Sequence, residues 1–182
     1  LRQADGRYIG GSGTEAGLQR RSERFVNPDA VGRLLDGIIP PDKRIRALLD
    51  AEKGVIGDAN KRRFGEYIVA VLRMPDNVAM LGEMQGPAAV RMRELATLQT
   101  GILNSGATDK QKSEAAEILD GICVGVLKSE RIFEKLAERA DNAVSEAISI
   151  MRLCAAGTFT EGVAAQAARE RIIRCLKAPS FL

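Results

Sequence analysis

Hydrophobic residues in this chain recur at spacings of three and four, which is the period of an amphipathic helix. The longest such run begins after Thr108 and continues to about residue 140. No segment alternates with a period of two, so the pattern predicts no β-strand. The remaining predicted helices are a short polar one from Thr14, then 28–37, 41–53, 58–74, 75–84, 87–103, 141–154 and one from Thr158 or Thr160 to just before Pro179.

Proline, glycine and capping residues set the expected helix boundaries. Pro28 and Pro41 stand where a helix begins, a position at which the missing N–H of proline costs nothing. Thr108 is expected to cap the longest run, and Asp58 and Asp141 to cap two others. These signals predict short connections between consecutive helices.

The predicted fold is an all-α, single-domain bundle of about seven or eight helices. We expect the domain to span residues 27–182 and to follow an N-terminal arm, residues 1–26, which is partly flexible because its first 13 residues include four glycines. We find no internal repeat of fixed period.

Composition supports close helix packing. Hydrophobic residues make up 45% of the chain, but aromatic residues only 4%, so Ala, Leu, Ile, Val and Met must form the core. Only seven charged residues lie between positions 64 and 108, which predicts that this stretch is enclosed or covered by a partner. No apolar run approaches the roughly 20 residues of a membrane-spanning helix, so no membrane association is expected. A chain that begins at Leu1 without Met is expected to be a fragment or a processed product.

The chain contains no histidine. This excludes Ser-His-Asp and Cys-His catalysis, histidine-ligated metals and the Glu-x-x-His di-iron pattern. The acidic residues are expected on outward, solvated faces, and the three cysteines form no C-x-x-C pair, which favours reduced, buried thiols in the cytoplasm. The sequence therefore predicts no catalytic residue, no cofactor and no metal site.

Two glycines and several groups of cations remain as candidate sites. Gly121 and Gly125 lie four residues apart on one helix face, which predicts close packing of a neighbouring helix or, as an alternative, a ligand cleft. Four cations in the last helix, between residues 169 and 177, add to three clusters of Lys and Arg nearer the N-terminus. Those clusters consist of Arg20, Arg21 and Arg24; Lys43, Arg44 and Arg46; and Lys61, Arg62 and Arg63.

These observations favour a non-catalytic helical module for protein–protein interaction, a regulatory or structural adaptor that binds another protein or itself. The alternative is a nucleic-acid-associated protein, which would require folding to bring the basic clusters to one side. A third hypothesis is a small-molecule sensor with an apolar pocket near Gly121 and Gly125. High usage of Ala, Gly and Arg is typical of proteins from GC-rich bacteria.

Overall fold

A computed structural model describes residues 40–55, 57–83, 86–137 and 140–178. Every regular element within these ranges is an α-helix, which confirms the predicted all-α class. The predicted arm and the predicted helices before residue 40 lie outside the described residues. The helices are α4 (Pro41–Lys53), α5 (Asp58–Arg73), α6 (Pro75–Glu83), α7 (Ala88–Leu103), α8 (Asp109–Lys128), α9 (Glu130–Ala137), α10 (Ala140–Ala155) and α11 (Gly162–Leu176).

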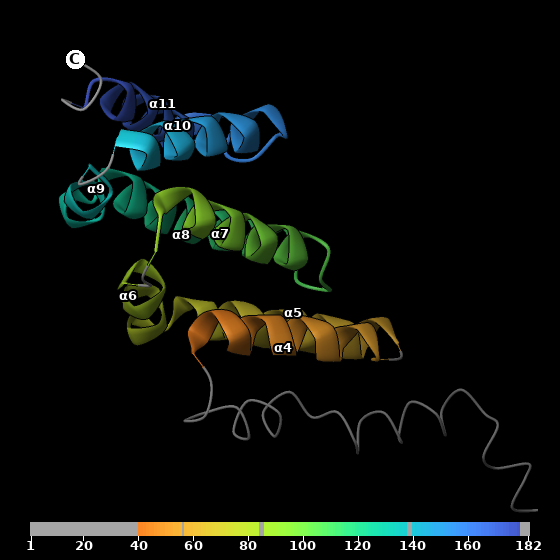
Figure 1. The fold of residues 1–182 in the computed structure, drawn as a ribbon. Helices are drawn as coiled ribbons and strands as arrows, with labels where there is room; N and C mark the ends of the chain where they lie inside the picture. The colour runs from red at the N-terminus through yellow and green to blue at the C-terminus, as the bar shows by residue number, and fades with distance from the viewer. Residues whose placement is uncertain (1–39, 56, 84–85, 138–139, 179–182) are drawn as a thin grey trace, which may run out of the picture.

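The helices form three antiparallel pairs stacked on one another (Figure 1). The pairs are α4–α5, α7–α8 and α10–α11, and short helices α6 and α9 lie on one side of the stack, where each links one pair to the next. Helix α7 packs between α4 and α10, and α8 packs between α5 and α11. Such a stack of helix pairs is the arrangement of an α-solenoid, although the sequence shows no fixed repeat.

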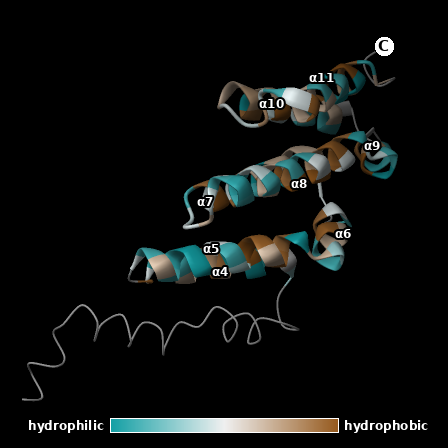
Figure 2. Ribbon diagram, turned by 180° about the vertical axis from the view of Figure 1, so that it is seen from behind, coloured by the Kyte–Doolittle hydropathy of each residue, from teal (hydrophilic) through white to brown (hydrophobic). Residues whose placement is uncertain are grey.

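The core runs through all three pairs. Phe64 and Ile68 of α5, Leu98 of α7 and Leu119 of α8 are among its fully buried side chains. Hydrophobic and hydrophilic residues both occur along the helices of the stack (Figure 2). Within the charge-poor stretch, α7 is enclosed as expected, because it contacts α4, α5, α8 and α10. In α6, however, only Asn77 and Leu81 are buried, so that part of the stretch is mostly exposed.

Most helix boundaries agree with the sequence prediction. Pro41 begins α4. Thr108 caps α8 in a capping box, in which its hydroxyl accepts from the Gln111 amide and its own amide donates to the Gln111 side chain. Two predicted caps are wrong by one or two residues: Asp58 is the first residue of α5, which follows Gly57, and Asp141 is the second residue of α10, which begins at Ala140. Differences of this size are usual at helix ends.

The predicted single helix from Thr108 to residue 140 is wrong, because the chain breaks at Ser129 into α8 and α9. Ser129 has an extended backbone with ψ of 115° and its hydroxyl accepts a hydrogen bond from the Ile132 amide at 3.4 Å. This bond satisfies one of the amides that the start of α9 leaves without an intrahelical partner.

Candidate functional site

A buried ion pair joins the last helix pair to the middle one. Arg171 of α11 donates from Nε to Oε1 of Glu146 in α10 at 2.8 Å, and both side chains are almost completely inaccessible to solvent. The second carboxylate oxygen of Glu146 accepts from the amide of Ala88 at 3.0 Å. Because Ala88 begins α7, Glu146 also lies at the positive end of that helix dipole.

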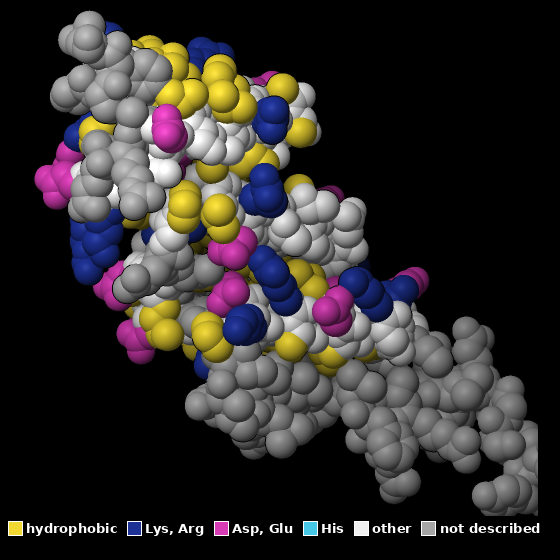
Figure 3. Space-filling model, in the orientation of Figure 1, with side chains coloured by type: hydrophobic (Ala, Val, Ile, Leu, Met, Phe, Trp, Pro, Cys, Tyr) yellow, Lys and Arg dark blue, Asp and Glu magenta, His cyan; other side chains and the backbone are white. Residues whose placement is uncertain are grey.

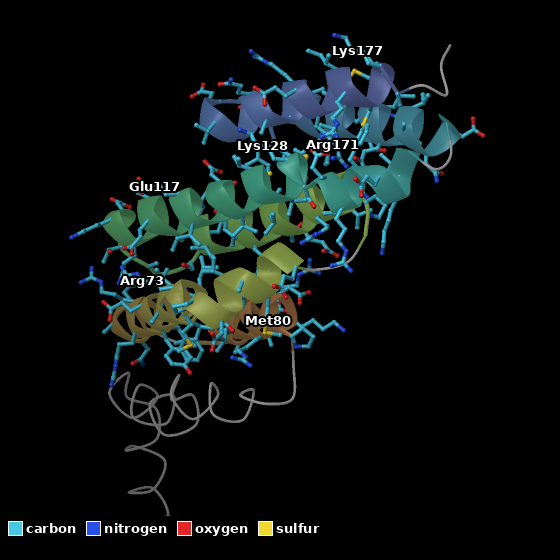
Figure 4. The ribbon with its side chains drawn as sticks, turned by 90° about the vertical axis from the view of Figure 1, so that its left-hand side faces the viewer. Arg73, Met80, Glu117, Lys128, Arg171 and Lys177 are labelled. Carbon is cyan, nitrogen blue, oxygen red and sulfur yellow. The ribbon has the colours of Figure 1, made fainter. Side chains whose placement is uncertain are left out.

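Arg171 contacts the end of α8 as well (Figure 4). Its Nη1 donates to the carbonyl oxygens of Leu127 at 3.4 Å and Ser129 at 3.3 Å. These carbonyls belong to the last turn of α8 and the residue after it, where helix carbonyls lack intrahelical partners. Glu146 and Arg171 therefore link the C-terminal end of α8, where the helix dipole is negative, to the N-terminal end of α7, where it is positive. The ion pair thus connects α7, α8, α10 and α11.

Phe133 of α9 lies against two guanidinium groups of α11. The Cζ atoms of Arg171 and Arg174 are 5.0 Å and 4.0 Å from the centre of its ring, within the range of cation–π attraction. Arg174 also forms an exposed ion pair with Glu130, and the hydrogen bond from Arg174 lowers the pKa of Glu130. These contacts hold α9 against α11.

The ion pair corrects two sequence-based expectations. Glu146 is buried, as are Asp42 and Glu52, so the prediction that the acidic residues all lie on solvated faces is wrong. Arg171 is 2% exposed and so does not belong to a basic surface on the last helix. A signal was present, since Arg171 lies four residues from both Ala167 and Cys175 and thus on the apolar stripe of α11.

The structure contradicts the prediction of close packing at Gly121 and Gly125. Both glycines are exposed, and a methyl group added to either would meet no atom within 4 Å. That face of α8 is open, which also removes the argument for a ligand cleft there. The glycines at which backbones do approach closely are Gly65 and Gly106, between α5 and the α7–α8 connection.

The basic clusters of α4 and α5 do not form a row. Lys61, Arg62 and Arg63 are exposed but consecutive, and three consecutive helical residues spread over about 200° of the helix surface. Lys43 is exposed and Arg46, three residues later on the same side of α4, is half-buried. Arg44, also half-buried, lies about 100° around the helix from Lys43. Acidic side chains lie between the cations on this part of the surface (Figure 3). The third cluster, Arg20, Arg21 and Arg24, lies outside the described residues.

Large hydrophobic side chains are exposed on the last helix pair. Ile148 and Met151 of α10 are 39% and 42% exposed, and Ile173 and Leu176 of α11 are 51% and 47% exposed. Each pair is spaced three residues apart, so its members share one side of their helix. Hydrophobic side chains gather over this end of the molecule (Figure 3). We refer to Ile148, Met151, Ile173 and Leu176 as the outer face.

The cysteines and acidic residues form no metal site among the residues described. Cys123, Cys154 and Cys175 are free, as expected, and Cys123 and Cys175 are buried. Burial raises the pKa of the Cys123 thiol to about 12. Among these residues no group of three or more acids and cysteines could hold a metal ion. None of the described helices is long and apolar enough to cross a membrane.

The chain matches no known protein family, no curated protein and no solved structure in the comparisons made with it.

Proposed function

We propose that this protein is a non-catalytic helical interaction module, a regulatory or structural adaptor, whose outer face binds a second copy of the chain. The observation that carries the proposal is the exposure of Ile148, Met151, Ile173 and Leu176 on the last helix pair of the stack. Clusters of exposed apolar side chains on a soluble domain commonly mark interaction sites.

Among the described helices, the last pair has a side that no further pair covers. The middle pair, α7–α8, is covered on one side by α4–α5 and on the other by α10–α11. The last pair packs on α7 and α8 with one side only. Stacked helix pairs usually end in a pair whose outer side is polar, because no further pair covers it. An apolar outer side is therefore suited to a helical partner.

The charges beside the outer face favour a second copy as that partner. The last helix pair carries exposed charges of both signs: Arg152 and Asp141 on α10, Arg169 and Glu170 on α11, and Lys177 just after α11. A twofold axis brings the same surface of two copies together, so a surface that carries both signs can pair its cations with the acids of its partner.

Other features agree with this proposal. The buried carboxylate of Glu146 has structural partners on both oxygens, which supports a structural rather than a catalytic role. Free cysteines suit a reducing compartment, so we place the protein in the cytoplasm, and the amino-acid usage fits a bacterial source.

The test is the molar mass in solution, measured by light scattering after size-exclusion chromatography at a protein concentration of about 0.1 mM. At that concentration, nearly all of a chain that dimerises with a micromolar dissociation constant is dimeric. We expect a dimer for the unmodified chain and a monomer for the variant Ile148→Asp with Ile173→Asp. Both side chains are exposed, so the substitutions leave the fold intact, which circular dichroism checks. Leu103→Asp, at an equally exposed leucine on α7, is the matched control and should remain a dimer.

A monomer for the unmodified chain over the whole concentration range would overturn binding to a second copy. A dimer that survives the double substitution, or that Leu103→Asp also dissociates, would show that the outer face is not the contact.

A further inference from the structure

A cavity of about 820 Å³ opens beside the buried ion pair. Its walls come from the end of α6, Gly86 and Pro87, the first turn of α7, Ser129 with helix α9, and the first half of α10. Its volume falls within the range of cavities that hold small organic ligands. The outer face, by contrast, contributes no residue to it.

Arg91, a buried guanidinium, lines this cavity without a carboxylate partner among the described residues. The residue is 3% exposed, and its Nη2 donates to the carbonyl oxygens of Leu81 at 2.9 Å and Gly82 at 2.7 Å. Its Nε and Nη1 form no hydrogen bond within the described part of the chain. Burial lowers the pKa of Arg91, and Glu94, one turn further along α7, opposes that shift. A buried cation with donors to spare is a place where an anion gains both charge pairing and hydrogen bonds.

The other walls add positive charge. Arg131 and Lys135 lie four residues apart on α9, both line the cavity and both are exposed. Two acids also line it, Glu83 and Glu146, but Glu146 is already neutralised by Arg171. The unpaired charge around the cavity is therefore positive, with Glu83 as the single opposing acid among the described lining residues.

The cavity also offers apolar and hydrogen-bonding surface. Ile132 and Leu136 of α9 and Val90 of α7 supply apolar contacts, and Ser145 and Ser149 of α10 supply hydroxyl groups. A ligand that contacts both the apolar side chains and the cations of the cavity has an apolar body and one anionic end. The guanidinium of Arg131, which also lines the cavity, has forked donors that a planar carboxylate matches better than a spherical anion does.

We propose that this cavity binds a small organic monocarboxylate, with its carboxylate toward Arg91, Arg131 and Lys135 and its apolar part along Ile132 and Leu136. Since α7 and α10 both contribute walls to the cavity, the bound ligand stabilises the contact between the middle and last helix pairs. The proposal is independent of the outer face and of the oligomeric state.

Isothermal titration calorimetry with hexanoate and benzoate tests the proposal, with 1-hexanol and inorganic phosphate as comparison probes. At least one carboxylate should bind with a dissociation constant of about 1 mM or tighter, and at least tenfold more tightly than 1-hexanol or phosphate. The same carboxylate should raise the melting temperature, because a ligand that binds only the folded state stabilises it.

Substitutions locate the binding. Arg131→Ala with Lys135→Ala removes two exposed cations and should weaken carboxylate binding at least tenfold without unfolding the chain. Ser149→Leu, at a half-buried residue of the cavity wall, should block it. Lys110→Ala with Lys128→Ala, at exposed positions on α8, is the control and should bind as the unmodified chain does.

Several results would overturn the proposal. These are no binding of either carboxylate, equal binding of 1-hexanol or phosphate, unchanged affinity after Arg131→Ala with Lys135→Ala, or an equal loss in the control variant.

Discussion

The two contacts between successive helix pairs are built in opposite ways. Where α4–α5 meets α7–α8, the chain brings backbone against backbone at Gly65 and Gly106, and Gly101 lies against the side chain of Leu49. A methyl group at Gly65 would lie 2.6 Å from Cα of Ala107, and one at Gly106 would lie 2.5 Å from the carbonyl oxygen of Lys61. The first contact is thus close because side chains are missing.

Where α7–α8 meets α10–α11, small alanines and one buried ion pair form the contact. Ala164, Ala167 and Ala168 of α11 are buried in the core, and Glu146 with Arg171 joins the ends of α7 and α8. A cavity remains beside this pair. Adding a methyl group at Gly65 or Gly106 is therefore expected to destabilise the first contact. Removing one charge of the Glu146–Arg171 pair is expected to destabilise the second.

The largest effect is expected at the second contact. Removing one member of a buried ion pair leaves the other charge without compensation, so Glu146→Ala or Arg171→Met should lower the free energy of unfolding by about 3–5 kcal/mol. The double variant Glu146→Leu with Arg171→Met leaves neither charge buried and should be more stable than either single variant. Urea unfolding followed by circular dichroism measures these differences. Losses below about 1 kcal/mol in both single variants would show that the pair is not the main support of this contact.

A smaller loss is expected at the first contact. Gly65→Ala adds a methyl group where the backbone of Ala107 leaves no space, and such overpacking costs about 1–3 kcal/mol. The same urea titration gives the value. If Gly65→Ala were neutral, the α7–α8 connection would have to move away from α5 at little cost, and the contrast between the two contacts would disappear.

The exposed glycines of α8 serve as the matched control for Gly65. Nothing lies within 4 Å of a methyl group at Gly121 or Gly125, and alanine is favoured over glycine inside a helix by about 0.5–1 kcal/mol. Gly121→Ala and Gly125→Ala should therefore each raise the free energy of unfolding by about that amount. Destabilisation by either substitution would contradict the open face seen in the structure.

The smallest effect concerns a buried acid at the first contact. Glu52 of α4 accepts a hydrogen bond from the Gly106 amide at 2.5 Å, and burial raises its pKa above the ordinary value of 4.5 despite that bond and the nearby Lys61 and Lys112. The folded state then binds a proton more tightly than the unfolded state. The contribution of Glu52 to stability is therefore fully present below pH 4.5 and is lost as the pH rises through the raised pKa.

Glu52→Gln should remove this pH dependence while keeping an oxygen for the Gly106 amide. The stability of the unmodified chain relative to the variant should thus fall as the pH rises above 4.5. Urea unfolding at several pH values measures it. If the stability of the unmodified chain relative to Glu52→Gln stayed constant or increased as the pH rose, the raised pKa of Glu52 would be contradicted.

Local signals accounted for most of the helices and for few of the candidate sites. Pro41 and the Thr108 capping box act within one turn of the chain, so their helix starts were predictable. The break at Ser129 was not, because the hydrophobic spacing continues through it and Arg171, 42 residues further along, donates to its carbonyl. The cavity was equally hidden, since its walls come from three separate segments of the chain.

The amino-acid sequence by itself determined the all-α class, the positions of most described helices and the absence of histidine chemistry. These follow from residue type and from spacing within one or two turns. Tertiary structure alone decided that the helices stack in pairs, that Gly65 and Gly106 rather than Gly121 and Gly125 are crowded, and that Arg171 is buried against Glu146. The physical reason is that a helix periodicity shows which side of a helix is apolar but not which neighbour covers it. Crowding, burial of charge and cavities all depend on that neighbour.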